Sequence, residues 1–300
     1  MIPIAFSDKY HHPLPQGHKF PMEKYTLIPE QLMYEESFSQ KHFFNPQIPD
    51  SLFLERVHQA VYLEKLFKGS ISEKEIRRIG FPYSKSLIER EIHICAGTTQ
   101  AAIKALHAGA SFNVAGGTHH AYADHGEGFC IFNDMAVAAM HLFHENKVGK
   151  ILIIDLDVHQ GNGTASIFKH EKRVFTFSMH GERNYPLKKE KSDLDIALPG
   201  TTDDKNYIDI LQKTLPELIK KEKPDIIFYQ SGVDILESDK LGSLRISKQA
   251  CMERDKIVYR LAYQNQIPVT ASMGGGYSSH IRDIVDAHCN TFRVAKHFFE

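Results

Sequence analysis

The sequence of 300 residues has no tryptophan and only 4 cysteines, and none of the cysteines forms a Cys-x-x-Cys pair. This spacing gives neither a zinc-finger nor a redox signature and does not suggest a disulfide framework. The 36 basic and 37 acidic residues nearly cancel, so no strong overall field would attract nucleic acid or an anionic membrane. Apolar runs reach only about six residues, too few to span a bilayer, and the N-terminus lacks the basic and apolar regions of a secretory signal. We therefore expect a cytoplasmic protein that has no nucleic-acid partner.

Short apolar segments alternate with amphipathic segments from residue 84 onward. This alternation predicts an α/β fold in which parallel strands are joined by helical crossovers. The expected strands are residues 111–115, 150–155, 174–178, 225–230 and 268–272. The expected helices are residues 84–108, 130–146, 161–169, 203–222, 247–266 and 279–298.

No linker rich in proline, glycine or serine divides the chain. We therefore expect a single domain over residues 1–300, to which residues 1–80 add loops and helices. The apolar run at residues 151–154 fits a strand that is buried on both faces of the sheet.

Glycine, histidine, aspartate or tyrosine residues follow each of the five expected strands. Ligands bind outside the carboxyl ends of the strands in open α/β sheets. Five such ends therefore predict one shared polar site. The segments are residues 116–120, 155–163, 178–181, 231–234 and 273–277.

Asp155, Asp157 and His159 are spaced two residues apart, so an extended chain would place all three on one face. Two carboxylates and an imidazole that share a face predict a cation between them, and these ligand types suit Zn²⁺ or Fe²⁺. Asp234, at a neighbouring strand end, is the natural further ligand. Three protein ligands leave a position for water or substrate, which is typical of a catalytic metal. A helix cap near Gly161 is a simpler interpretation, but it would explain one aspartate and not the spacing of three.

The adjacent His119 and His120 follow two glycines. Two imidazoles beside a metal can divide the work of general base and general acid. Asp155 and Asn162 are candidate hydrogen-bond partners for these histidines. Tyr277 follows three glycines, and a tyrosine on such a loop can donate its hydroxyl to a developing oxyanion.

Together these motifs resemble the histone deacetylase family of zinc-dependent amidohydrolases. They occur in the family's order and span roughly residues 80–300. The matching segments are Gly-Gly-Thr-His-His-Ala, Gly-Phe-Cys-Ile-Phe-Asn-Asp, Asp-Leu-Asp-Val-His-Gln-Gly-Asn-Gly, Ser-Met-His, Gly-Val-Asp and Gly-Gly-Gly-Tyr. Gln160, Asn162 and the early Gly-His-Lys-Phe-Pro-Met segment resemble the class IV-like and bacterial branch.

The resemblance implies an arginase/deacetylase-type fold, in which an open, mostly parallel sheet of eight strands has helices on both faces. It implies that Asp157, His159 and Asp234 bind zinc, and iron would suit the same ligands. It also implies that Gly128 and Phe129 line the tube that admits an acylated lysine side chain.

The same resemblance implies that His119 and His120 are the acid/base pair, with Asp155 hydrogen-bonded to His119 and Asn162 facing His120. Tyr277 would polarise the acyl carbonyl. An inner site for a monovalent cation, usually a structural potassium ion, is implied at a further set of positions. These are Asp155, Asp157, His159, Ser178 and Met179.

Two features depart from the family's pattern. The commoner Gly-Gly-Trp-His-His segment is Gly-Gly-Thr-His-His here, so we expect the packing beneath the histidine pair to differ. No residue matches the acidic rim residue that often holds the substrate backbone.

The implied function is metal-dependent hydrolysis of the amide bond of N6-acylated lysine, acetylated or with a longer acyl chain, in proteins or peptides. Deacylation of small N-acyl amines such as acetylpolyamines is an alternative that would use the same residues. A ureohydrolase like arginase would need a paired Asp-x-Asp with two manganese ions, and only Asp234 stands at that strand end. A catalytically inactive acyl-lysine reader would not need the histidine pair and Tyr277. The acyl length and the oligomeric state stay open.

Overall fold

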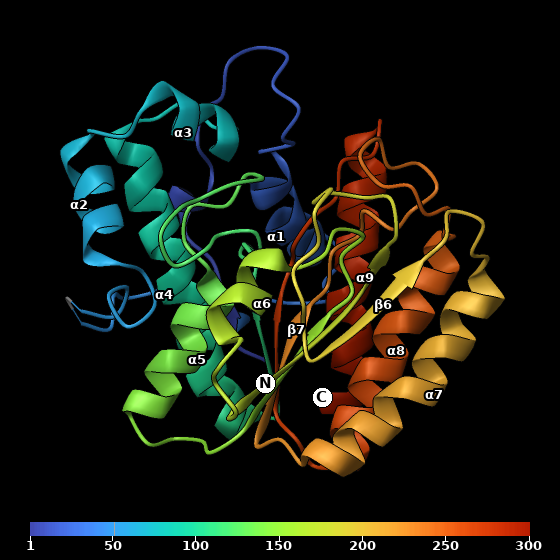
Figure 1. Ribbon diagram of the computed structural model, residues 1–300. Helices are drawn as coiled ribbons and strands as arrows, with labels where there is room; N and C mark the ends of the chain where they lie inside the picture. Colours follow the sequence, from blue (N-terminus) through green and yellow to red (C-terminus); the bar gives the residue numbers. More distant parts are fainter. Residues whose placement is uncertain (51) are drawn as a thin grey trace.

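The computed structural model describes residues 1–50 and 52–300 (Figure 1). Its centre is one sheet of eight strands in the order β2-β1-β3-β8-β7-β4-β5-β6, and every neighbouring pair is parallel. The sheet implied by the resemblance is therefore confirmed. The strands are β1 (Ile4–Ala5), β2 (Phe43–Phe44), β3 (Ala110–Asn113), β4 (Ile151–Asp155), β5 (Val174–Gly181), β6 (Leu194–Leu198), β7 (Ile226–Gln230) and β8 (Val269–Ser272).

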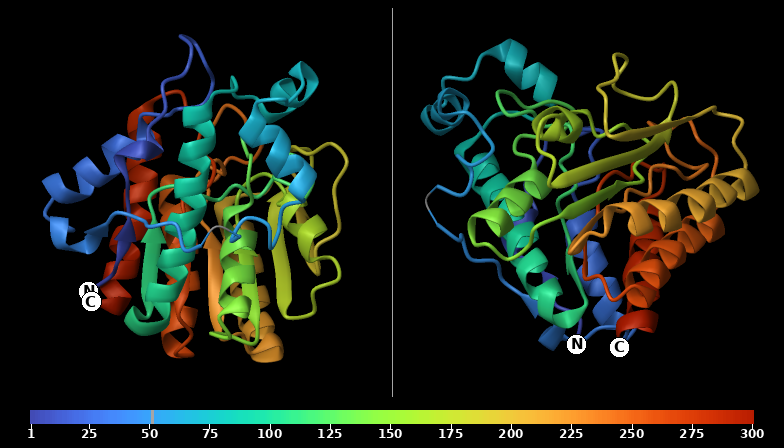
Figure 2. Two further views of the ribbon diagram at one scale, coloured as in Figure 1. Left: turned by 90° about the vertical axis from the view of Figure 1, so that its left-hand side faces the viewer. Right: turned by 60° about the horizontal axis from the view of Figure 1, so that its bottom comes forward.

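Helices cover both faces of the sheet. α4, α5 and α6 lie on one face, and α7, α8 and α9 lie on the other, where α1 packs against α9 (Figures 1 and 2). Among the residues that the structure describes, no helix has the length and apolar character needed to cross a membrane. The helices are α1 (Lys24–Tyr34), α2 (Ala60–Lys68), α3 (Glu73–Ile79), α4 (Lys85–Ala108), α5 (Asp134–His144), α6 (Asn162–Phe168), α7 (Asp204–Glu222), α8 (Lys248–Gln264) and α9 (Ile281–Phe299).

Three strands lie outside the five that the sequence predicts. β1 and β2 come from the N-terminal segment, for which only loops and helices were expected, and they form one edge of the sheet beside β3. Each has two residues, which is too short to show a periodic pattern. β6 forms the opposite edge, and most of its residues are partly exposed, so it has no continuous apolar run.

β4 lies near the middle of the sheet, between β7 and β5. Residues 151–154 are at most 1% exposed, as expected for a strand buried on both faces. The strands around β4 are in order β3, β8, β7, β4 and β5, which are the five strands that the sequence predicts. Their carboxyl ends therefore meet at one edge, and the segments that follow them form the candidate site.

The two ends of the chain lie side by side, away from the carboxyl ends of the central strands (Figure 2). The backbone N–H of Ile2 donates to Oε1 of Glu300 at 2.5 Å. The N-terminal strand and α9 are thereby fixed to each other, far from the loops that carry the polar motifs.

Candidate active site and metal centre

Asp157, His159 and Asp234 meet at the carboxyl end of β4. Nδ1 of His159 lies 3.0 Å from Oδ1 of Asp157 and 3.0 Å from Oδ2 of Asp234. One ligand atom from each residue lies within 4.8 Å of the others, a grouping that could hold a metal ion. The three side chains are separated by up to 77 positions in sequence, and the order of the strands brings them together.

The donor set fits a divalent cation because two carboxylates are buried there with a single imidazole. Asp157 and Asp234 are at most 1% exposed. Burial and then the charge of Asp157 raise the pKa of Asp234 to about 7. Burial alone would lower the pKa of His159, but hydrogen bonds to both aspartates outweigh burial and raise it to about 10. Buried charges need a partner, and a cation held by these ligands would supply one.

The glycine-rich loop after β8 approaches these carboxylates so closely that side chains would not fit. The backbone N–H of Gly275 donates to Oδ2 of Asp157 at 2.8 Å. A Cβ on Gly275 would overlap Oδ2 of Asp234. On the other side, the N–H of Val158 donates to Oδ1 of Asp234 at 2.9 Å. These backbone N–H groups therefore orient the two carboxylates, and the close approach requires glycine at position 275.

His119 is paired with a carboxylate. Its Nδ1 lies 2.7 Å from Oδ2 of Asp155. Burial would lower the pKa of His119, but the charges of Asp155 and Asp157 outweigh burial and raise it to about 9. The carboxylate of Asp155 orients the ring and stabilises its protonated form.

His120 faces a neutral partner instead. Its Nδ1 lies 2.6 Å from Oδ1 of Asn162. The amide of Asn162 is oriented by its Nδ2, which donates to Oε1 of Glu127 at 2.6 Å and to the hydroxyl of Tyr122 at 3.1 Å. Oδ1 must then accept from His120, so Nδ1 of His120 carries the proton and Nε2 is left free. Burial, followed by the positive charges of His119 and His159, lowers the pKa of His120 well below its ordinary value.

Asp134 organises the backbone beneath the histidine pair, at Gly117 and Thr118. Its carboxylate accepts from the N–H of Gly117 at 3.1 Å and from the N–H and the hydroxyl of Thr118 at 2.8 and 2.7 Å. Thr98 donates to the same carboxylate at 2.6 Å. The sequence analysis quoted Asp134 within a motif but gave it no role.

Tyr277 stands beside the metal centre, with its ring centroid 6.4 Å from that of His159. Its backbone N–H donates to Oδ2 of Asp239 at 2.6 Å. Burial, then the charges of Asp234 and Asp157, raise the pKa of Tyr277 well above its ordinary value, so its hydroxyl keeps its proton. Asp239, which no motif in the sequence indicates, therefore fixes the loop that carries the tyrosine.

Lys24 is a further residue that the sequence analysis missed. It is fully buried at the start of α1, and its Nζ donates to the carbonyl of Gly274 at 2.9 Å. The ammonium lies 5.8 Å from the ring centroid of Tyr277 and 5.2 Å from that of Phe20. Burial lowers the pKa of Lys24 to about 8. The lysine ties the N-terminal segment to the glycine-rich loop.

Two neighbouring cavities reach these groups. An inner cavity of about 30 Å³ is lined by the histidine pair, Asp157, His159 and Tyr277. An outer cavity of about 340 Å³ adjoins it. Both cavities are lined by Gly128, Phe129, His120, His159 and Tyr277.

Gly128 and Phe129 form part of the wall between the inner and outer cavities. Both have left-handed backbone, with φ of 57° and 65°. A Cβ on Gly128 would press against the ring of His120. The ring of Phe129 packs 6.0 Å from that of Tyr277.

The remaining expected ligands lie where β4 and β5 pair. Asp155 is aligned with Ser178 in the register of these strands, and Met179 follows. The Ser178 hydroxyl lies 2.9 Å from Nδ1 of His180, a contact that the sequence analysis did not anticipate. Oδ1 of Asp155 accepts the N–H of Asp157 at 3.2 Å.

The sequence is similar to those of known proteins. A family model described as the histone deacetylase domain matches residues 18–292. An uncharacterized protein of Picosynechococcus sp. is 40% identical over 295 residues, which cover 98% of each chain. Histone deacetylase 2 of Arabidopsis thaliana is 30% identical over 288 residues, covering 92% of this chain and 74% of its own.

Two further comparisons are more distant. Acetoin utilization protein AcuC of Staphylococcus aureus is 29% identical over 285 residues, covering 87% of this chain and 73% of its own. The crystal structure of the HDA15 HD domain superposes with a TM-score of 0.80 at 20% identity, covering 98% of this chain and 90% of that one. The last similarity concerns the fold.

Proposed function

The chain belongs to the histone deacetylase family, and on that premise we propose that it hydrolyses the amide bond of N6-acylated lysine with the help of a bound divalent metal ion. Family membership indicates a deacetylase, which is a hydrolase. The proposal of metal-dependent hydrolysis rests on the meeting of Asp157, His159 and Asp234. Two of these three residues line the same cavity as His120 and Tyr277. Zinc suits the ligands because they are one imidazole and two carboxylates.

The metal would be held by Asp157, His159 and Asp234. Bound there, zinc supplies a Lewis acid that polarises the acyl oxygen and makes a water molecule more acidic. A structural potassium ion belongs to the same proposal. Its ligands would be Asp155, Asp157, His159, Ser178 and Met179.

The chain's own groups divide the proton transfers. Neutral His120 lines both cavities, has a free Nε2 and acts as the general base that takes a proton from water. His119, which is protonated against Asp155, acts as the general acid that gives a proton to the leaving amine. Tyr277 donates its hydroxyl hydrogen to the acyl oxygen as negative charge develops there. Asn162 fixes the tautomer of His120.

The sizes of the two cavities suit an acetylated lysine. The inner volume of about 30 Å³ exceeds the roughly 10–15 Å³ that one water molecule needs, which leaves little more than space for an acetyl methyl group. The outer volume of about 340 Å³ is available for the lysine side chain and its carrier. We therefore propose acetyl-lysine as the preferred acyl-lysine.

We also propose that residues 1–300 act as a single catalytic domain in the cytoplasm. The four cysteines are all buried and free, which is compatible with a reducing compartment.

A turnover panel on the zinc-loaded protein tests the proposed function. One lysine peptide carrying acetyl, butyryl, octanoyl or myristoyl groups is compared with an acetylpolyamine, and the zinc content is measured on the same sample. We expect hydrolysis of the acetyl peptide, with kcat/KM falling as the acyl chain lengthens. If stoichiometric zinc is bound and every substrate stays intact, the proposal is wrong.

A further inference from the structure

The outer cavity is lined by two arginines and by no carboxylate among the residues that the structure describes. Arg78 follows Arg77 at the end of α3, and Arg183 lies on the loop after β5. Both side chains are exposed, and neither forms an ion pair within the described part of the chain. They share the cavity wall with His120, His159 and Tyr277. Two unpaired positive charges therefore stand at the entrance to the proposed catalytic groups.

The carboxylates of the neighbouring loops are already engaged. Oε1 of Glu127 accepts from Asn162 at 2.6 Å, and Oδ1 of Asp124 lies 2.7 Å from Nδ1 of His125. Oε1 of Glu190 accepts from the Tyr122 hydroxyl at 3.3 Å. Among the described residues, none of these carboxylates forms an ion pair with Arg78 or Arg183.

Asp239 is engaged in the same way. Its carboxylate accepts three backbone N–H groups, those of Tyr277, Leu241 and Gly242, at 2.6, 2.8 and 2.8 Å. It does not line the outer cavity.

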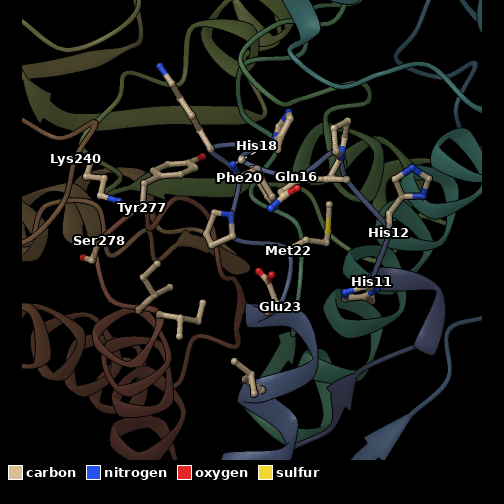
Figure 3. A pocket seen from close by; sticks show the side chains of 18 of the residues that line it. His11, His12, Gln16, His18, Phe20, Met22, Glu23, Lys240, Tyr277 and Ser278 are labelled. Carbon is tan, nitrogen blue, oxygen red and sulfur yellow. Dashed lines mark hydrogen bonds between the residues drawn. The ribbon is translucent and has the colours of Figure 1, made fainter.

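A larger groove adjoins the entrance and continues the same charge pattern. This groove has a volume of about 930 Å³ and shares Leu241 and Tyr277 with the outer cavity. Figure 3 shows Lys240, Tyr277 and Ser278 on one wall, facing the N-terminal loop on the other. Lys19 and Lys240 line the groove, and their side chains form no ion pair within the described residues.

Glu23 is the single carboxylate that lines the groove in the described chain, at the foot of the N-terminal loop (Figure 3). Together the two hollows present four permanent cations, Arg78, Arg183, Lys19 and Lys240, against this one acid. The protein as a whole has a net charge of -1, so this excess is local. A local field of this kind selects the charge of what approaches it.

We propose that this entrance selects acyl-lysine whose carrier presents carboxylates beside the acylated residue. This inference rests on the proposed function and names the charge of its substrate. Guanidinium groups bind carboxylates through paired hydrogen bonds, and Arg78 and Arg183 have free donors for that purpose. The carboxylates are either aspartate and glutamate side chains that flank the acyl-lysine or its own α-carboxylate.

The same charges disfavour the alternative class of substrate. An acetylpolyamine carries ammonium groups beyond its amide and needs carboxylates near the entrance. Here it would meet arginines at the entrance and lysines in the groove. Repulsion between the ammonium groups of the substrate and these cationic side chains would slow association and weaken binding.

Matched acetyl-lysine substrates test the selection. One peptide sequence is made with aspartate and glutamate, with alanine, or with lysine and arginine on both sides of the acetyl-lysine. Free N6-acetyl-lysine is compared with its α-amide to separate an α-carboxylate from flanking side chains, and an acetylpolyamine completes the series. We measure kcat/KM at two salt concentrations, and equilibrium binding of each peptide by calorimetry.

The variants are Arg78→Gln, Arg183→Gln and the double variant, with Arg77→Gln as a matched control. Arg77 is also exposed on α3, but its Nη1 pairs with Glu73 at 3.3 Å and it lines neither hollow. We expect each entrance arginine to account for roughly a twofold to fivefold preference for the acidic peptide, because solvent-exposed ion pairs are of that strength. The preference should act mainly on KM and weaken with salt, while Arg77→Gln should leave it unchanged.

The results of these experiments distinguish the charge selection from the proposed hydrolysis. Equal kcat/KM and equal binding for acidic, neutral and basic peptides would overturn the selection and leave the proposed function standing. A preference that Arg77→Gln reduces as much as Arg78→Gln would overturn it as well. Preferential binding of the acidic peptide without any turnover would uphold the charge selection and reject the hydrolysis.

Discussion

Nδ1 of His120 lies 2.6 Å from an amide oxygen, that of Asn162, whereas the neighbouring His119 faces a carboxylate. The two adjacent imidazoles therefore have opposite pKa shifts: the pKa of His119 is raised to about 9 and that of His120 is lowered. One ring is a proton donor and the other a proton acceptor under the same conditions. This difference is the electrostatic basis of the proposed division between acid and base.

The first prediction concerns Asn162→Asp. His120 must be neutral to act as a base, so its lowered pKa places the acidic limb of the kcat/KM profile below about pH 6.5. A carboxylate at position 162 favours the imidazolium, and we expect the limb to move to higher pH by about one to three pH units. The measurement is kcat/KM from pH 5 to pH 9.

Asn162→Ala is the control for this change. It removes the hydrogen bond to His120 without adding charge, so activity should fall while the acidic limb does not move upward. An acidic limb that stays in place in Asn162→Asp would show that another group than His120 controls it.

The second prediction concerns Tyr277→Phe. The raised pKa of Tyr277 keeps its hydroxyl protonated, so the side chain can donate to an acyl oxygen throughout the working pH range. Loss of one such donor lowers kcat by roughly 10²–10³-fold in enzymes with an oxyanion hole. We expect a loss of this size with bound zinc and melting temperature unchanged. An unchanged kcat would remove Tyr277 from the chemistry.

The sequence predicted the residues that converge at the candidate site better than the residues that hold the surrounding loops in place. The converging residues directly follow strands, which gives them a recognisable pattern. Asp157 and His159 come directly after an apolar run, and Asp234 follows another, so the rule for strand ends brings them together. Lys24 gives no such signal. It stands 250 positions from Gly274, whose carbonyl it binds, in the N-terminal segment for which only unspecified loops and helices are predicted.

The edges of the sheet were missed for a related reason. β1 and β2 have two residues each and are strands only because they pair with neighbours, β1 with β3 and β2 with β1. Asp239 was missed because its role is to accept backbone N–H groups from a distant loop, and such acceptors have no spacing rule.

The third prediction concerns stability and His58, which is 1% exposed. Its Nε2 accepts the N–H of Asn133 at 3.0 Å, and its Nδ1 lies 3.1 Å from the carbonyl of Tyr122. Burial lowers the pKa of His58 to about 4, below the value of about 6.5 in an unfolded chain. The unfolded chain therefore binds more protons between these values, so stability falls as the pH decreases from 6.5 to 4.

This single group should account for about 3 kcal/mol of the free energy of unfolding lost over that range. His58→Phe should be less stable at pH 7.5 by about 1–3 kcal/mol for each backbone group left unpaired. It should also lose less stability on acidification than the unaltered protein. Urea unfolding at several pH values measures both effects, and the exposed His170→Phe is the control. Parallel pH curves for the unaltered protein and His58→Phe would contradict the assignment.

The fourth prediction concerns Gly275→Ala and the metal. Position 275 does not have a positive φ, so alanine introduces no backbone strain there. Its Cβ would instead overlap Oδ2 of Asp234 and displace a carboxylate that the metal needs. We expect a loss of bound zinc of about tenfold or more, by analogy with the 10–100-fold effects of altering the groups that orient metal ligands. Activity should fall in parallel.

Gly149→Ala is the matched control, because the nearest atom to an added Cβ there, Oδ2 of Asp225, is 3.4 Å away. Elemental analysis and melting curves are recorded before and after treatment with a chelator. The chelator should lower the melting temperature of the unaltered protein and of Gly149→Ala, since their buried carboxylates lose a cation. It should change Gly275→Ala little, because that variant has already lost most of its metal. Full zinc occupancy in Gly275→Ala, with an unchanged response to the chelator, would show that Asp234 does not hold the ion.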